Sequence, residues 1–247
     1  MALVRGTTTL YKVASSADTS VPVVLADTGL NKLAVVVVRG RGGSVVVGTD
    51  ITLDGLSCND FQVNNFDAGG VAAYGASGYF TNAQHPGGGS VTLAFVVPSG
   101  VNNLIFEVIE YTGALQINSR SAETQVHDND IVEAGLVDIV LGNQSGEAAV
   151  IYCSSSDSVL ASGSGGHTVD ADATMLDQDF DDRNRSAFAE DAVVAASSVT
   201  YTWTLSHDGA ANMDNVVLGA FAVFAAPEVP HIEPLPQRNI RHSGVYH

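Results

Sequence analysis

Hydrophobic residues in this chain fall in short runs that are rich in β-branched side chains and are bounded by Gly, Asn, Ser and Asp. Helical periodicity is weak throughout, whereas runs of this length and composition are typical of β-strands. The runs span residues 33–38, 44–47, 91–97, 104–111, 136–141, 148–152, 199–205 and 216–224. The pattern therefore predicts an all-β protein with at most one short helix.

Two of these runs predict how their strands are buried. In residues 199–205, Val199, Tyr201 and Trp203 alternate with threonines, as in an antiparallel strand with one face in the core. Residues 216–224 are apolar at almost every position, which predicts a central strand covered on both faces.

An internal repeat groups the strands into two halves. Residues 90–109 and 198–221 both read as a strand, a polar turn and a long apolar strand, beginning with Ser-Val-Thr. A repeat of hairpins predicts two similar halves, each of which would leave one apolar sheet face bare. We therefore expect an antiparallel two-sheet β-sandwich of jelly-roll type over residues 21–226. It is preceded by an N-terminal docking segment, residues 1–20.

The last 21 residues, 227–247, differ in composition from the rest. Four of the seven prolines lie between Pro227 and Pro236, which excludes a central strand and predicts an extended, polyproline-like arm. Its two arginines, Arg238 and Arg241, balance its two glutamates, so the arm has no net charge.

The chain as a whole is strongly acidic, with 10 Lys and Arg against 27 Asp and Glu, a net charge of −17. Such a protein is repelled by nucleic-acid phosphates and by anionic membranes, so we expect neither as a partner. No apolar run reaches membrane-spanning length, and the first ten residues lack a signal-peptide core. We expect a protein made in the cytoplasm.

No strong catalytic motif is present, and we do not expect an enzyme. The sequence lacks the Gly-x-Ser-x-Gly elbow and the Gly-Lys-Ser/Thr phosphate loop. The pairs His127-Asp128 and His207-Asp208 would need a serine placed in space, which sequence does not show. No cofactor is expected, apart from a calcium ion considered next.

Three carboxylates alternate along one predicted strand, at Asp177, Asp179 and Asp181. Several carboxylate oxygens on a flexible backbone suit Ca²⁺, although the sequence departs from the EF-hand pattern. The alternative is an acidic strand edge that discourages aggregation.

An aromatic group and two cysteines leave further alternatives open. Tyr74, Tyr79 and Phe80 lie in a Gly-rich stretch, where they could form a ligand platform in a loop or pack beneath it. Cys58 and Cys153 lack metal-ligand spacing, and they are either two buried thiols or a disulfide.

The order of strand motifs resembles a known kind of module. Asn31-Lys-Leu-Ala-Val-Val-Val-Val, Asn103-Leu-Ile-Phe-Glu-Val-Ile-Glu-Tyr and Ser198-Val-Thr-Tyr-Thr-Trp-Thr-Leu are similar to strands of a β-sandwich module in bacterial surface proteins and phage virion proteins. The resemblance covers residues 21–226, implies display, adhesion or virion assembly, and supplies no catalytic residues.

We therefore expect a virion structural protein, most simply one that decorates the outer surface of a phage capsid. Its partners would be the major capsid protein or other virion subunits, with several copies on each particle. The terminal segments would make the contacts, through Leu3, Val4, Arg5, Pro227, Val229, Pro230, Ile232, Pro234, Leu235, Pro236, Arg238 and Arg241. The alternative is an adhesin of a tail or head fibre that binds a host-surface glycan through Tyr74, Tyr79 and Phe80.

Overall fold

A computed structural model describes residues 2–12, 19–25, 30–42, 48–67, 72–85, 88–96, 101–129, 131, 134–142, 148–156, 167–170, 173–181, 184–191, 198–205 and 215–227. Within these residues the regular secondary structure is entirely β, and every strand pairing is antiparallel. The expected all-β, antiparallel fold is confirmed.

The N-terminal half is a sandwich of two sheets. Its strands are β1 (Val4–Lys12), β2 (Ser20–Leu25), β3 (Leu33–Gly42), β4 (Asp50–Leu53), β5 (Leu56–Ser57), β6 (Asn59–Phe66), β7 (Ala72–Thr81), β8 (Gly89–Val96) and β9 (Val101–Thr112). One sheet has the order β1-β9-β3-β7-β6 and the other has the order β2-β8-β4-β5.

The C-terminal half repeats this arrangement. Its strands are β10 (Thr124–Asp128), β11 (Leu136–Leu141), β12 (Ala148–Ser156), β13 (Thr168–Val169), β14 (Thr174–Asp181), β15 (Asn184–Asp191), β16 (Val199–Thr204) and β17 (Asn215–Val223). The sheet orders are β10-β17-β12-β15-β14 and β11-β16-β13, so β1 corresponds to β10, β3 to β12 and β9 to β17. The predicted repeat of two similar halves is confirmed.

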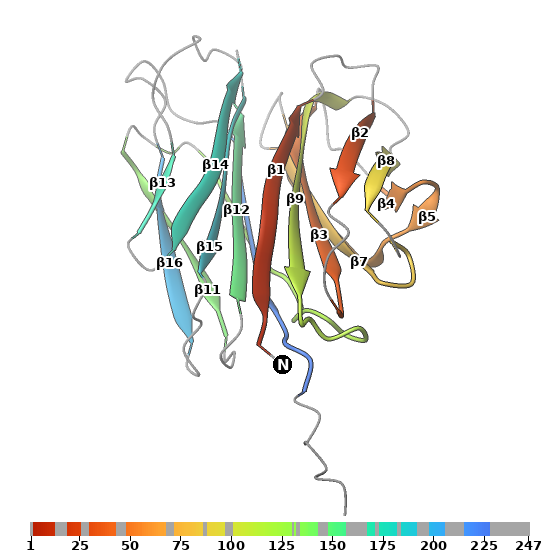
Figure 1. The fold of residues 1–247 in the computed structure, drawn as a ribbon. Coiled ribbons are helices and arrows are strands. Elements are labelled where there is room, and N and C mark those ends of the chain that lie inside the picture. The colour runs from red at the N-terminus through yellow and green to blue at the C-terminus, as the bar shows by residue number, and fades with distance from the viewer. Residues whose placement is uncertain are drawn as a thin grey trace, which may run out of the picture.

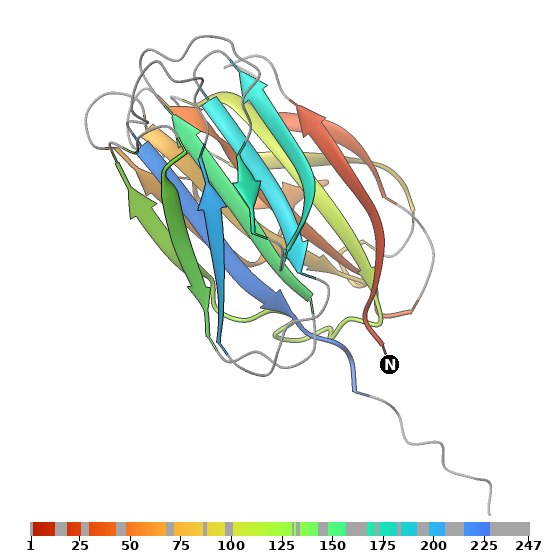
Figure 2. The ribbon, with the colours of Figure 1, turned by 90° about the vertical axis from the view of Figure 1, so that its left-hand side faces the viewer.

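The number of sheets differs from the expectation. The two halves were expected to contribute one sheet each, but the described residues form four sheets in four layers (Figures 1 and 2). Each half has its own core, because both faces of its five-stranded sheet are apolar. One face packs on the short sheet of the same half, and the other packs on the five-stranded sheet of the other half.

The interface between the two five-stranded sheets, which we call the seam, is a third core. It contains large side chains from both halves, including Tyr111, Tyr152, Phe188 and Phe221. The bare apolar faces inferred from the repeat are therefore real, and they cover each other. This burial makes the two halves one body.

The detailed burial of two strands also agrees with the sequence pattern. Tyr201 and Trp203 of β16 are fully buried, while Thr200 is exposed and Thr202 and Thr204 are partly exposed. Every residue of β17 is buried. β17 lies between β10 and β12 and is covered by a sheet on each side.

Candidate functional site at the basal end

Segments that are distant in the sequence meet at one end of the molecule, which we call the basal end (residues 2–4, 30–32, 113–121 and 222–227). β1 begins there, with Val4 opposite Thr112. The linker between the halves starts at residue 113, and β17 ends at Val223 before the chain runs to Pro227. Figures 1 and 2 show the first described residues, the linker and the segment after β17 at this same end.

The linker is hydrogen-bonded to the segment that follows β17, and we call this paired region the strap. Ala114 pairs with Ala225 and Arg120 pairs with Val223 as antiparallel bridges. The backbone bonds run from Leu115 N to Phe224 O at 2.8 Å, from Ala226 N to Gly113 O at 2.7 Å, from Phe224 N to Ser119 O at 2.9 Å and from Ser121 N to Ala222 O at 2.9 Å. The strap fixes the point at which the C-terminal arm leaves the body.

The linker is also bonded to the turn that precedes β3. Gly113 N donates to Leu30 O at 3.0 Å, and the Gln116 side-chain amide donates to Lys32 O at 3.0 Å. Because backbone groups of both segments are satisfied, their side chains can point to solvent without exposing unpaired polar groups beneath them.

Three large apolar side chains are exposed at the basal end. Val4, Leu30 and Ile117 expose 56%, 72% and 76% of their surface. They lie on three segments that are held together by the pairing of Val4 with Thr112 and by the hydrogen bonds of Gly113 and Gln116. The end therefore presents apolar side chains on segments that are hydrogen-bonded to one another.

Arg120 holds the linker against the N-terminal half. Its Nε donates to Asp60 Oδ2 at 2.7 Å, its Nη1 donates to Ser77 Oγ at 2.6 Å, and Glu123 lies 3.6 Å away. The guanidinium also lies 4.5 Å from the centroid of the Phe221 ring. The cation is thus fully engaged within the molecule.

Tyr152 joins this group from the middle of the seam. Its hydroxyl donates to Glu123 Oε1 at 2.7 Å, and burial followed by the charge of Glu123 raises its pKa well above the usual 10.0. Its ring lies against Gly75 and Gly219, where any Cβ atom would overlap it. β7 and β17, which belong to opposite halves, therefore each need a glycine where the Tyr152 ring packs between them.

The opposite side of the seam has a second polar tie. Arg5 Nη1 of β1 contacts Glu190 Oε2 of β15 at 2.7 Å, and the Tyr111 hydroxyl donates to Glu190 Oε1 at 2.6 Å. Burial raises the pKa of Tyr111 well above its usual range, and the Glu190 charge adds to this. The tie fixes the start of β1 to the C-terminal half.

The structure locates the residues expected to dock on a partner, at least in part. Leu3 is partly buried against the seam, Val4 is exposed, and Arg5 is paired with Glu190. Residues 4–12 of the expected docking segment are a strand of the body. Pro227 is exposed at the exit. The other expected arm contacts lie outside the described residues: Val229, Pro230, Ile232, Pro234, Leu235, Pro236, Arg238 and Arg241.

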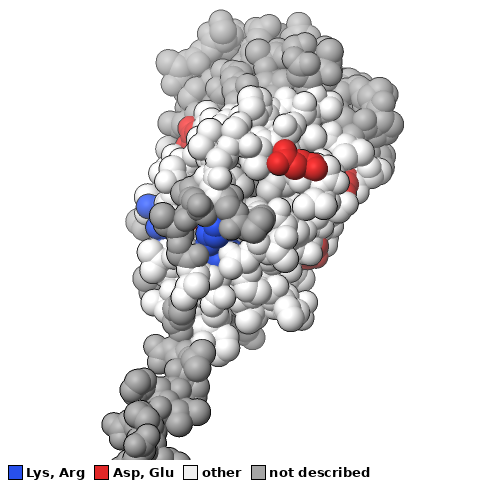
Figure 3. Space-filling view, turned by 45° about the vertical axis from the view of Figure 1, so that its right-hand side comes forward, with Lys and Arg blue, Asp and Glu red and all other residues white. Residues whose placement is uncertain are grey.

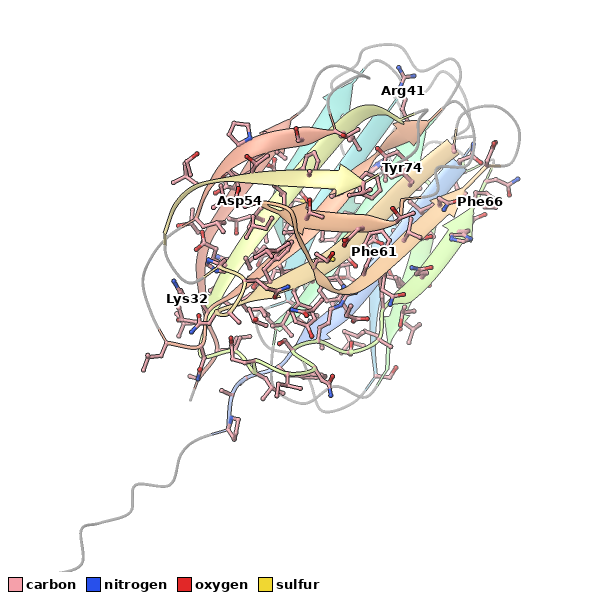
Figure 4. All side chains as sticks on the ribbon, turned by 90° about the vertical axis from the view of Figure 1, so that its right-hand side faces the viewer. Lys32, Arg41, Asp54, Phe61, Phe66 and Tyr74 are labelled. Carbon is pink, nitrogen blue, oxygen red and sulfur yellow. The ribbon has the colours of Figure 1, made fainter. Side chains whose placement is uncertain are left out.

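The expected ligand loop is wrong. Residues 72–81 form β7, an interior strand of its sheet, and Tyr74, Tyr79 and Phe80 expose only 0%, 5% and 0% of their surface. Figure 4 shows Tyr74 within the body, where its ring stacks on Phe95 with centroids 6.0 Å apart. β7 contains many small residues, which allow the neighbouring sheets to pack closely against it. In the sequence, the same run of Gly, Ala and Ser is typical of a loop.

The acidic row and the thiols are placed less completely. Asp177 lies in β14, an edge strand, while the side chains of Asp179 and Asp181 lie outside the described residues. Among the residues that are described, no three His, Cys, Asp or Glu side chains come together as metal ligands. Cys58 and Cys153 are free thiols, and burial raises the pKa of Cys58 to about 12.

The basal end itself could not be predicted from the sequence. Leu30 and Ile117 are single apolar residues in polar stretches, and nothing in their local pattern marks them as neighbours. Only the pairing of residues 113–121 with residues 222–226 brings them to the same surface as the chain exit.

Figure 3 shows one face of the molecule on which charged atoms are few and scattered among the described residues. None of the described segments is a helix able to cross a membrane. Comparison with known proteins gives no similarity: no family model, no curated protein and no solved structure matches this chain.

Proposed function

We propose that this protein is a structural protein of a phage virion that decorates the outside of the capsid and attaches through its basal end. The observation that supports this most is the meeting of the first described residues, the linker and the chain exit at one end. A protein anchored by its terminal segments needs them on the side that faces the particle.

The build of the body supports a role in display. Two sandwiches are joined by a buried seam, so a contact made at the basal end fixes the orientation of all four layers. Such a role needs shape and attachment, and no chemical step.

The distribution of charge supports an outer location. Residues 1–226 hold all of the net charge of −17, and the arm from 227 onward is neutral. An acidic body is repelled by packaged DNA, whereas a neutral arm can approach another protein surface without that repulsion.

The direct test uses particles of the virus that encodes the chain. We expect the full-length protein to co-sediment with heads in a density gradient and to be labelled by antibody on intact particles. Recovery only in the soluble fraction, or labelling only after the heads are opened, would overturn the proposal.

A pair of variants tests the basal end itself. Ile117→Asp should weaken attachment by about tenfold or more, because a buried apolar contact is replaced by a charge. The control is Leu136→Asp, since Leu136 of β11 is also 65% exposed but belongs to the far outer sheet. Equal binding by both variants would show that the basal end is not the attachment surface.

A further inference from the structure

The outer edge of β1 is the longest strand edge among the described residues. β1 is the last strand of its sheet, and within the described residues its backbone pairs only with β9. At nine residues it is the longest described edge strand, and its register is continuous from Thr8 to Lys12 after an irregularity near Arg5. An exposed edge of this kind is a template for a further strand.

Other described edges of the two five-stranded sheets are less suited to accept a strand. β14 has Asp177, Asp179 and Asp181 at alternating positions, β10 has only five residues, and the Val63 carbonyl of β6 already accepts a bond from the Gln125 side chain. β1 has charge only at its ends, at Arg5 and Lys12, and Arg5 is neutralised by Glu190.

We propose that β1 of one copy binds the proline-free end of the arm, residues 237–247, of a second copy as an added strand. The inference rests on the proposed function in one respect: copies attached to the same particle would lie side by side, so that the arm of one copy could reach β1 of the next.

The composition of the arm selects its end as the occupant. Residues 227–236 contain four prolines, which lack amide donors and cannot complete a ladder. Residues 237–247 contain no proline, so each of their amides can pair with an edge. They include Arg238 and Arg241 and no acidic residue.

Charge favours the side of the molecule with β1 and β14 as the binding site for residues 237–247. Arg5 of β1 contacts Glu190 of β15, the strand that pairs with β14. The acidic strand β14 is therefore the facing edge on the β1 side of the seam. On the other side, Asn64 of β6 is bonded to His127 of β10. A segment with two arginines and no acidic side chain is attracted to the side that carries β14.

The proline-rich spacer explains why the acceptor is a second copy. Ten residues that favour the extended polyproline conformation span roughly 30 Å and resist a sharp return. A spacer of this composition that begins after Pro227 would favour contact with a neighbouring copy over a return to its own β1, and the proposal therefore takes a second copy as the acceptor.

Disulfide trapping in the full chain tests the contact without any particle. The variant Thr9→Cys/Ile240→Cys places one thiol on β1 and one in the arm. The matched control is Gln125→Cys/Ile240→Cys, because Gln125 is exposed on β10, the strand equivalent to β1 in the other half. The native thiols compete poorly, since Cys153 is buried and the pKa of Cys58 is raised to about 12.

We expect covalent dimers and ladders from the β1 pair, at a yield about tenfold above the β10 pair and rising with protein concentration. A synthetic peptide of residues 237–247 should suppress them, and the same peptide with both arginines replaced by glutamate should not. Equal yields from the two pairs would overturn the proposal. A cross-linked monomer at every concentration would also overturn it, because the arm would then lie on its own body.

These outcomes are separate from those of the particle experiment. A protein that binds heads but gives no β1 dimers keeps the proposed function and loses the proposed contact between β1 and the arm of a second copy. Dimers without head binding would support the contact between β1 and the arm and would overturn the proposed function.

Discussion

At the scale of single residues, the seam depends on a few side chains whose environment is unusual. Tyr152 lies between the backbones of Gly75 and Gly219 and donates to Glu123. Tyr74 and Tyr111 are also buried, and burial raises the pKa of all three hydroxyls. Nothing in the local sequence distinguishes these glycines and tyrosines, because contacts across the seam join residues that are far apart in the chain.

The glycines that face Tyr152 should not tolerate even one added methyl group. Gly219→Ala forces the ring or the strand to move, and such overpacking costs about 1–3 kcal/mol. Gly142→Ala is the control, since an added Cβ there meets nothing within 4 Å, and its effect should stay within about 0.5 kcal/mol. Urea unfolding of both variants measures this, and equal stabilities would contradict the packing described.

The buried tyrosines also predict how stability changes at high pH. Their folded-state pKa lies above the value of 10.0, so the folded protein holds these protons more tightly than the unfolded chain does. Their contribution is complete below pH 10 and is lost as the pH rises beyond it. In an absorbance titration, Tyr74, Tyr111 and Tyr152 should ionise only when the protein unfolds. Ionisation of all seven tyrosines near pH 10 with the fold intact would disprove this.

At the scale of elements, the sequence predicts the strands that have regular apolar patterns. It does not predict strands whose residues are small or polar. β11 and β12 begin where predicted, and β16 and β17 begin within a residue of it. β7 was mistaken for a loop because a strand packed between two sheets contains small residues. β1 was mistaken for a separate docking segment because its threonines and glycine give no apolar run.

An ion pair between adjacent strands gives a prediction at this scale. Arg39 of β3 is paired with Glu107 of β9, both fully buried, and Arg39 also donates to the Cys153 carbonyl of β12 at 3.3 Å. Arg39→Met removes the Arg39 cation from beside the buried Glu107 carboxylate, and losses of this kind are about 3–5 kcal/mol.

The double variant Arg39→Met/Glu107→Leu should recover much of that loss, since it removes both charges from the interior. Thermal unfolding of the single and double variants separates the two effects. A double variant no more stable than Arg39→Met alone would mean that the pair contributes by shape and not by charge.

At the scale of the whole molecule, the repeat predicted two halves, but not that each half is a complete sandwich. Sequence shows which strands have two apolar faces, and it does not show which sheet covers each face. The basal end depends on the same missing information, because the strap joins residues more than 100 positions apart. The property of the basal end that the sequence does predict is the zero net charge of the arm that leaves it.

The seam predicts that the two halves unfold together. Unfolding one half alone would expose the apolar residues of the seam on the other, including Val150, Phe188 and Phe221. Calorimetry should therefore give one transition, with calorimetric and van't Hoff enthalpies that agree. Two resolved transitions would show that each sandwich is stable by itself.

The position of the chain exit has a mechanical consequence. A pull on the arm acts along β17, which is paired with β12 from Asn215 to Val223 and with β10 from Val216 to Ala220. Hydrogen bonds of antiparallel strands lie perpendicular to the strand axis, so a lengthwise force strains these bonds together instead of opening them one by one. An anchor at this exit would transmit drag on the body into shear of its most deeply buried strand, the geometry in which a sheet resists force best.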